Sequence, residues 1–333
     1  MAKFQNMGTF DLNTMQGGAK PFAMDAAGIA SGQAFLTSEL EKRDMLVRTP
    51  LTSFTYNRDI PIRVGGGWAE YVSAMNVGYG ITGGSGDNLI QSASTDGIPL
   101  IQANFGKDLW KTHVISAGTR IFWVDMQRGN MTGRNIDTLL RDGLRMTYDK
   151  HMDENTYVGF SRYGTTGLVN NANVAITSAT GNFTAITPDQ ILEDINTAIR
   201  TAWAAAGYDL DAIPNHIIMP YEQFNYIATT RIGQLAEKTI LTFLLENNVA
   251  KQNDVDLYIG ATAWCDGAGA GGADRMVVYC NKERYIAMDE LVPLTRAMTT
   301  PNAERFSYDT AYAGNVSEVE VFYTQPIIYV DGI

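Results

Sequence analysis

Cysteine is scarce in this 333-residue sequence, and the scarcity excludes two kinds of site. Cys265 and Cys280 are the only cysteines, and they do not form a C-x-x-C motif. Two cysteines are too few for a disulfide framework, and their spacing does not fit a zinc or redox centre. We therefore expect two reduced thiols.

Long apolar runs and an excess of positive charge are also missing. No stretch approaches the roughly 18 consecutive apolar residues that a membrane span needs, and residues 1–18 lack the basic-then-apolar pattern of a signal peptide. We expect no membrane contact, and synthesis and assembly in a cytoplasm. The 25 Lys and Arg residues are outnumbered by 36 Asp and Glu residues, which gives a net charge of -11. This sign disfavours sequence-specific nucleic-acid binding but is compatible with a container that must release nucleic acid.

Two segments match the glycine pattern of dinucleotide-binding proteins, G-x-G-x-x-G. They are Gly78, Gly80 and Gly83, and Gly267, Gly269 and Gly272. In a dinucleotide site the glycine turn opens a helix whose N-terminus holds the pyrophosphate. The first match runs into more Gly, Ser and Asp, and the second runs into a predicted strand at 276–280. We therefore interpret both as mobile surface loops.

The three histidines do not form a recognisable site. His113, His151 and His216 fall in a predicted strand, a helix and another strand, without H-E-x-x-H spacing and without a cysteine pair nearby. No G-x-S-x-G nucleophile motif occurs either. The sequence predicts no catalytic residue, no metal site and no cofactor, so we expect a protein that is not an enzyme.

The first part of the chain is rich in glycine and in residues that favour strands. Residues 1–32 have the mixed composition of an extended arm, and 33–47 have the periodicity of a short amphipathic helix. From Thr52 to Gln127 we expect strands, including 68–72, 113–116 and 119–126. The Gly-, Ser-, Asp- and Asn-rich stretch 78–97 is typical of the tip of a long hairpin.

The clearest helix is predicted at 135–158, because apolar residues recur there at three- and four-residue steps. These residues are Ile136, Leu139, Leu140, Leu144, Tyr148 and Met152. A charged opposite face predicts that one side of the helix is solvated.

An α/β unit is predicted at about 186–300. The Thr187-Pro188-Asp189 start signal predicts a helix to Ala206. Further strands are expected at 216–219, 255–260 and 276–280, further helices at 221–228 and 239–247, and a Gly-rich loop at 266–274. Alternating and apolar runs at 318–323 and 327–330 predict two final strands.

Four segments in this order resemble parts of the major capsid proteins of tailed bacteriophages: 68–72, 111–116, 134–159 and 164–171. They are similar to that family's projecting loop, spine helix and the loop that follows. The resemblance implies an α+β fold with an N-terminal arm and short helix (1–50), a β-rich segment (51–130) with an extended loop at about 64–115, a peripheral domain with the spine helix (131–185), an axial domain (186–300) and strands that return to the peripheral domain (301–333).

The resemblance also implies a function: a structural subunit that self-assembles through hexamers and pentamers into the icosahedral shell of a virion, around double-stranded phage DNA. Scaffolding, portal and decoration proteins are the further partners that it implies. Two features depart from some relatives. Residues 1–32 are neither long nor charged enough for a built-in scaffold, so either a separate scaffolding protein or none at all is expected. Lys107 and Lys111 lie where some relatives carry a cross-linking lysine, but no matching Asn and Glu can be identified.

Five aromatic residues are the predicted inter-subunit contacts: Phe22, Trp68, Tyr71, Phe105 and Trp110. The arm and the loop have little core of their own, so these side chains would gain apolar burial from neighbouring subunits. Two alternatives stay open. One is an encapsulin-type shell protein of the same fold, and the other is a cytosolic nucleotide-dependent enzyme built on residues 186–300.

Overall fold

The computed structural model describes residues 50, 52–82, 100–132, 135–233 and 237–333. The chain divides into two compact units, 1–53 and 54–333, and all the helices and strands below belong to the second unit. The predicted arm at 1–32 and the predicted helix at 33–47 lie outside the described residues.

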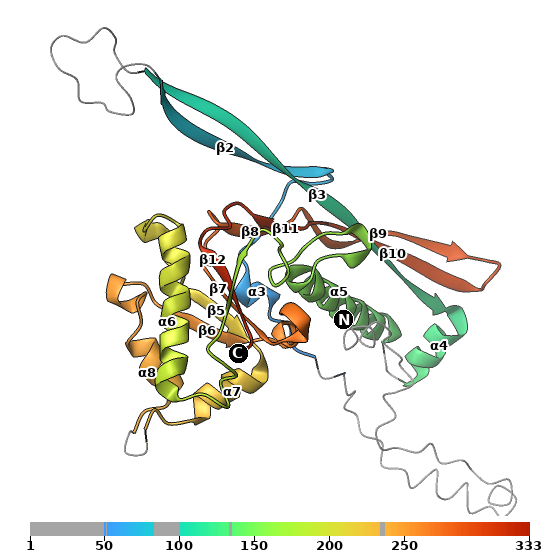
Figure 1. Cartoon of the computed structure of the whole chain (residues 1–333). Helices are drawn as coiled ribbons and strands as arrows, with labels where there is room; N and C mark the ends of the chain where they lie inside the picture. Colours follow the sequence, from blue (N-terminus) through green and yellow to red (C-terminus); the bar gives the residue numbers. More distant parts are fainter. Residues whose placement is uncertain (1–49, 51, 83–99, 133–134, 234–236) are drawn as a thin grey trace, which may run out of the picture. The chain divides into compact units, whose positions relative to one another are not determined.

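A five-stranded sheet forms the centre of the α/β part of the chain (Figure 1). Its order is β4 (Ala175–Ser178), β12 (Ile327–Asp331), β7 (Arg275–Tyr279), β5 (His216–Met219) and β6 (Tyr258–Ala261). Every residue of β5, β7 and β12 is buried, and most of these residues are apolar. Both faces of the sheet must therefore be covered.

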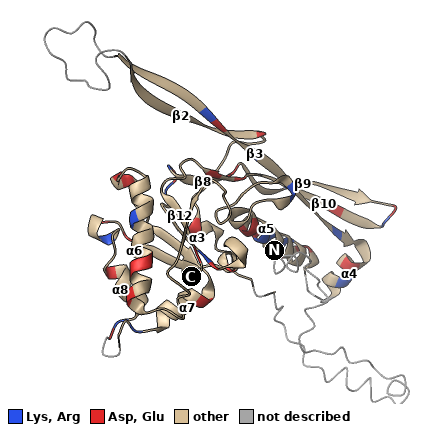
Figure 2. Ribbon diagram, viewed as in Figure 1, with Lys and Arg blue, Asp and Glu red and all other residues tan. Residues whose placement is uncertain are grey.

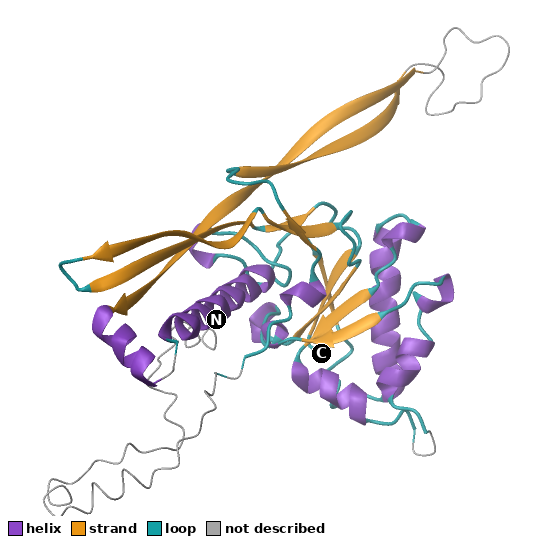
Figure 3. Cartoon of the chain, turned by 180° about the vertical axis from the view of Figure 1, so that it is seen from behind, coloured by secondary structure: helices purple, strands orange, loops and turns teal. Residues whose placement is uncertain are grey.

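One face of this sheet is covered by helices α6 (Pro188–Ala205), α7 (Tyr221–Thr229) and α8 (Ile240–Glu246). In Figures 1 and 3, α6 and α8 lie together beside the sheet. Helix α6 begins at Pro188, and the Gln190 side chain accepts a hydrogen bond from the Thr187 amide, as in a capping box. Its buried residues Ile191, Ile195 and Ile199 follow the helical repeat and pack into this core.

The other face of the same sheet packs against helix α5 (Ile136–Tyr157), which confirms the helix predicted at 135–158. The Asn135 side chain caps the N-terminus of the helix, because its Oδ1 accepts hydrogen bonds from the backbone amides of Asp137 and Thr138. The buried side chains lie in the second half of the helix, where Met152 and Tyr157 enter the core. Gly159 follows with φ +81°, and a Cβ there would lie 2.5 Å from the Thr165 carbonyl oxygen, so glycine is required.

A four-stranded antiparallel sheet has the order β2 (Tyr71–Thr82), β3 (Leu100–Phe122), β10 (Ser307–Ser317) and β9 (Val292–Asn302). Strand β3 pairs with β2 through its first half and with β10 through its second half. A smaller sheet contains β1 (Ile62–Val64), β8 (Ile286–Glu290) and β11 (Val319–Val321). The remaining elements are α3 (Tyr56–Asp59), α4 (Trp123–Thr132) and 3₁₀ turns at 161–163, 210–212, 251–253, 263–265 and 270–272.

Two sequence predictions are wrong at the level of elements, and three strands were not predicted. The strand expected at 119–126 ends at Phe122 because its partner β10 begins there, at Ser307, and α4 starts at the next residue. Strand β2 begins at Tyr71, not at Trp68. Strands β8, β9 and β10 were not predicted as separate elements, although residues 286–317 are largely strand.

The end of the chain also differs from the expected return of the strands after Arg305. Strand β10 does pair with β3, but β12 lies between β4 and β7 in the five-stranded sheet. Its five residues are all buried, so a central position satisfies both its faces. Residues 292–300, which we expected to belong to the α/β part, lie in β9 and pair with β10 instead.

Among the described residues, none of the helices combines the length and the apolar character that crossing a bilayer requires.

Candidate functional site

The hairpin of β2 and β3 has two chemically different faces. The strands pair antiparallel from Tyr71 opposite Lys111 to Thr82 opposite Leu100, without a break in register. Because directly opposed residues point to the same side of a sheet, the odd-numbered residues of both strands share one face. In Figure 2 the hairpin carries few charged positions along its length.

The odd-numbered face is apolar and exposed. We call the following residues the apolar hairpin face: Tyr71, Met75, Val77, Tyr79, Ile101, Phe105 and Leu109. Their side chains are between 42% (Val77) and 78% (Tyr79) exposed. Lys107, opposite Met75, and Lys111, opposite Tyr71, are the charged residues of this face. A contiguous apolar surface of this kind marks a protein interaction site.

The even-numbered face of the hairpin is small and polar by contrast. Asn104 lies opposite Gly78, and Asp108 lies opposite Ala74. Only near the root does this face carry a large aromatic, Trp110, which packs edge-to-face on Phe322 with 5.1 Å between ring centroids.

The root of the hairpin is held by residues of β10 and of the turn after it. The Asn315 side-chain amide donates hydrogen bonds to the carbonyl oxygens of Gly67 (3.2 Å) and Ala69 (3.0 Å). Thr112 Oγ1 donates to the Ala69 oxygen as well (2.7 Å), and the Lys111 amide donates to Glu318 Oε1 (3.0 Å). These contacts fix where the hairpin leaves the sheet.

The structure separates the predicted contact residues. Tyr71 (56% exposed) and Phe105 (71%) lie on the apolar hairpin face, and Trp68 (59%) is exposed just before β2. Trp110 lies on the other face and is half-buried, with an intramolecular partner. Phe22 lies outside the described residues. The other five residues of the apolar hairpin face were not predicted, although their period-two alternation indicates a shared face: Met75, Val77, Tyr79, Ile101 and Leu109.

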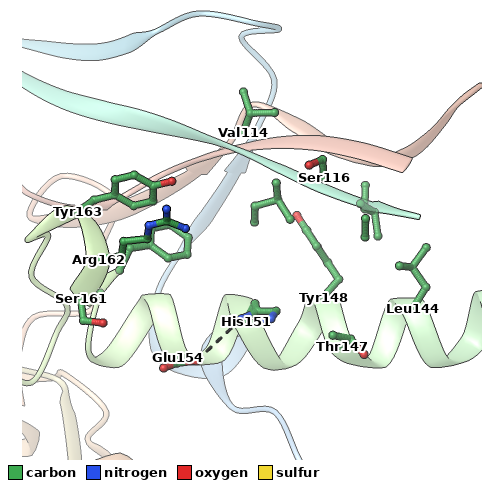
Figure 4. A pocket seen from close by; sticks show the side chains of 15 residues that line it. Val114, Ser116, Leu144, Thr147, Tyr148, His151, Glu154, Ser161, Arg162 and Tyr163 are labelled. Carbon is green, nitrogen blue, oxygen red and sulfur yellow. Dashed lines mark ion pairs between the residues drawn. The ribbon is translucent and has the colours of Figure 1, made fainter. Parts of the chain in front are cut away.

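A groove of about 530 Å³ lies between β3 and α5 (Figure 4). Arg162 and Tyr163 line one end, and Leu144 lies toward the other. The histidine of this groove, His151, has its Nδ1 3.9 Å from Glu154 Oε2, and each side chain is at least half exposed. Among the described residues His151 forms no hydrogen bond with a serine or cysteine side chain, so the groove holds no Ser-His or Cys-His pair there.

Buried His113 and His216 have structural surroundings. His113 stacks on the Tyr163 ring at 4.7 Å and meets Phe160 edge-on, and burial lowers its pKa. His216 Nε2 lies 3.0 Å from Asp59 Oδ1. These positions support the interpretation of both residues as packing histidines.

Asp59 is the centre of a buried polar cluster that joins three elements. The Arg58 guanidinium donates to both its carboxylate oxygens (2.6 and 2.8 Å), and Tyr157 of α5 donates a hydrogen bond to it, as His216 of β5 pairs with it. Burial acts to raise the pKa of Asp59, but the hydrogen bonds from His216 and Arg58 outweigh it, so that the pKa is lowered. The cluster ties α3 and α5 to the five-stranded sheet.

The Gly-rich loop at 266–274 is braced, which corrects its interpretation as a mobile loop. Asp274 accepts hydrogen bonds from the Gly267 amide (2.9 Å) and the Gln223 side chain (2.7 Å). Asp331 accepts one from the Ala270 amide (3.0 Å) while it pairs with buried Arg275. These carboxylates occupy amides that a pyrophosphate would need, which argues against a dinucleotide site.

The described residues contain no group of three or more His, Cys, Asp or Glu side chains that could hold a metal ion. Cys265 and Cys280 are both buried and both free, as the sequence predicts.

The exposed apolar hairpin face is a surface suited to association with another protein. The comparisons with known proteins agree. A family model described as major capsid protein matches residues 86–333, and this chain belongs to that family.

Solved phage capsids have the same fold. The capsid protein of Myoviridae phage XM1 is 17% identical, with a TM-score of 0.75 over 89% of this chain and 98% of that chain. Microbacterium phage Oxtober96 gives 12% identity and a TM-score of 0.62, covering 92% and 98% of the two chains. The capsid of an empty GTA particle gives 12% and 0.61, covering 94% and 99%. Among proteins with curated descriptions, none matches this sequence.

The chain is therefore a structural protein, a capsid subunit of an icosahedral viral shell, and it associates with copies of itself. Its α+β fold is the tailed-phage capsid fold that the sequence resemblance implies.

Proposed function

We propose that the apolar hairpin face is the surface through which each subunit grips a neighbouring copy in hexamers and pentamers of the shell. The observation that carries this proposal is the exposure of its seven apolar side chains on a strand pair that has no other strand beside β2 among the described residues. Burial of one such side chain contributes roughly 1.5–3 kcal/mol. Many such contacts in one closed shell make assembly stable even though each is weak.

The lysines of this face fit the same role. Lys107 and Lys111 point to the side of the apolar residues, whereas the whole chain carries a net charge of -11. A neighbouring copy is therefore acidic on average, so the two ammonium groups add electrostatic attraction and steer the encounter. We propose no covalent cross-link through either lysine.

The capsid fold and the family membership support a wider proposal for the parts of the chain and their partners. In this proposal the extended loop is at about 64–115, the peripheral domain contains α5, and the axial domain contains the five-stranded sheet with its helices. The arm at 1–50 lies along an adjacent subunit. The shell encloses double-stranded phage DNA without sequence-specific binding, assembles in the cytoplasm of a bacterial host, uses scaffolding, portal and decoration proteins, and catalyses no reaction.

The test compares two substitutions on neighbouring residues of β3. Phe105→Asp places a charge on the apolar hairpin face, and Asn104→Asp places the same charge on the opposite face. We expect Phe105→Asp to abolish particles seen by electron microscopy, or to raise the protein concentration needed for assembly at least about tenfold, which corresponds to roughly 1.4 kcal/mol per contact. Asn104→Asp should assemble like the unmodified chain.

Equal behaviour of the two variants would contradict the proposal, as would a chain that stays monomeric with and without a scaffold partner. The contents of purified particles separate the shell alternatives. Nuclease-protected DNA supports the phage shell, and an enclosed protein cargo without DNA would support an encapsulin.

A further inference from the structure

The outer edge of β2 is an unpaired sheet edge among the described residues. In the four-stranded sheet, β2 has β3 on one side and no strand on the other. The Thr112 amide donates to the Glu70 carbonyl oxygen at 3.1 Å, which makes Glu70 and Thr112 a hydrogen-bonded pair at the root of the ladder. Since hydrogen-bonded and non-hydrogen-bonded pairs alternate, the even residues of β2 bond to β3. The backbone N–H and C=O groups of its odd residues point to the outer edge.

This edge lacks the features by which proteins usually protect sheet edges. The twelve residues Tyr71–Thr82 contain no charged residue and no proline. The opposite edge strand of the same sheet, β9, carries Pro293, Arg296 and Pro301. The edge strands of the five-stranded sheet, β4 and β6, are only four residues long. A long, uncharged edge without proline is a template for pairing with another strand.

The even-numbered side chains of β2 leave room for such a strand. Gly78 and Gly80 have open space where a Cβ would be, and Ala74 is small. On the other face, an added strand would lie directly beside the odd-numbered side chains of the apolar hairpin face. Backbone pairing and apolar burial would then act on the same partner.

We propose that the outer edge of β2 accepts an extended strand from a second copy of this chain, so that the hairpin becomes part of an intermolecular sheet. A second copy is the occupant because the edge is continuous with the apolar hairpin face. This choice of occupant rests on the proposed function of that face. Family membership adds that many copies of this chain are concentrated in one shell. The neutral edge also imposes no repulsion on an acidic partner.

Residue-resolved amide hydrogen exchange tests the pairing directly. The amides of Ser73, Met75, Val77 and Tyr79 should exchange freely in the unassembled subunit and at least about tenfold more slowly in particles assembled from this chain alone. The even-numbered amides of β2 bond to β3, so they should be protected in both states. Odd amides that stay unprotected in particles would overturn the inference and leave the proposed function intact.

A proline substitution at the outer edge is the second test. Ser73→Pro removes an outward N–H but none of the bonds to β3, and edge strands tolerate proline at such positions. We expect it to raise the concentration needed for assembly at least about tenfold, whereas Ser73→Ala, which keeps the N–H, should leave it unchanged. Equal assembly of the two variants overturns the inference.

The exchange data also identify the occupant. Protection of the odd amides that appears only after a scaffolding or decoration protein is added assigns the edge to that partner and overturns pairing with a second copy. If no particles form under either condition, the proposed function and the inference both fail.

Discussion

At the scale of single residues, Glu320 is a buried carboxylate whose surroundings move its pKa into the neutral range. It is fully buried in β11, and its Oε2 accepts a hydrogen bond from Arg63, which also pairs with Asp289 at 2.6 Å. Burial raises the pKa of Glu320 to about 7, and the nearby negative charge of Asp289 adds to the effect. One arginine thus serves two carboxylates, of which the buried one holds its proton near neutral pH.

This raised pKa predicts a pH dependence of stability. Between its unfolded pKa of about 4.5 and its folded pKa of about 7, Glu320 binds more proton in the folded state than in the unfolded state. The free energy of unfolding should therefore fall as pH rises through this window. Glu320→Gln, which mimics the protonated form, should weaken the fall in denaturant titrations of the unassembled subunit between about pH 5 and pH 8.

Exposed Glu283→Gln is the matched control and should keep the pH dependence of the unmodified chain. A Glu320→Gln profile with the same slope would mean that another group titrates in this window.

The buried carboxylate of Asp59 predicts a large loss of stability. Asp59→Asn leaves Arg58 without its bidentate partner and His216 without its carboxylate, in the cluster that joins α3, α5 and β5. Removal of one partner from a buried ion pair typically costs about 3–5 kcal/mol. We expect a loss near the lower limit because Arg58 is one-third exposed, measured as a shift of the urea midpoint.

Asp309→Asn supplies the comparison, since Asp309 forms a similar two-bond pair with Arg120 on the exposed part of β10. Its loss should be much smaller. Comparable losses for the two variants would show that the Asp59 cluster does not join the elements as described.

At the scale of elements, removal of a side-chain hydrogen bond at the root of the hairpin should loosen the hairpin root and leave other elements unchanged. Asn315→Ala removes two hydrogen bonds to the chain just before β2, and Thr112→Val removes one. Each bond contributes roughly 0.5–1.5 kcal/mol. We expect amide exchange at residues 67–72 to accelerate in both variants, and more in Asn315→Ala.

The five-stranded sheet should not respond to these two substitutions, since they act on a different sheet. Faster exchange in β5 or β7 would show that the root contacts support the whole unit and not the hairpin alone.

The elements also show how far sequence reasoning reaches. Helix α5 was predictable because its apolar face repeats over 22 residues, and the hairpin because its strands flank a Gly-rich tip. Helix α4 was not predictable, since Trp123 and Val124 favour a strand. The strand ends before them because pairing with β10 stops at Phe122 and the Trp123 ring packs on Phe306. The position of β12 depends on which strands meet across about 150 residues of chain, a tertiary effect that local patterns do not contain.

The predicted contact residues show the same division between what local sequence patterns reveal and what depends on tertiary contacts. Aromatic content directed attention to Tyr71 and Phe105, which do lie on one exposed face. It also suggested Trp110, whose partner Phe322 is more than 200 residues away and cannot be inferred locally. Alternation along β2 was the better guide to the face, because period two directly reports which side chains share a side.

At the scale of the whole molecule, residues 54–333 form one compact unit whose two cysteines lie in different hydrophobic clusters. Both side chains are fully buried, and burial raises the pKa of each thiol, to about 11 for Cys280. Thiolate is the reactive form, so neither thiol should react with an aromatic disulfide reagent in the native subunit.

In denaturant both thiols should become reactive at the same rate, because exposure of either requires the unit to open as a whole. Labelling analysed by peptide mass spectrometry measures the two rates separately. Earlier reaction of Cys280 would instead identify a part of the unit that opens alone.

Strand β3 has a mechanical consequence. Its 23 residues run without interruption from the hairpin into the sheet with β10, a length of roughly 75 Å. On the other side of the root, Gly65, Gly66 and Gly67 all have positive φ, a conformation that glycine adopts without strain, and no strand of the sheet continues through them. A pulling force on the hairpin is therefore transmitted along β3. The eleven-residue ladder with β10 is then loaded in shear, so its hydrogen bonds resist the force together. Tension between neighbouring subunits of a shell would thus be spread over the whole ladder of β3 and β10 and not concentrated at one residue.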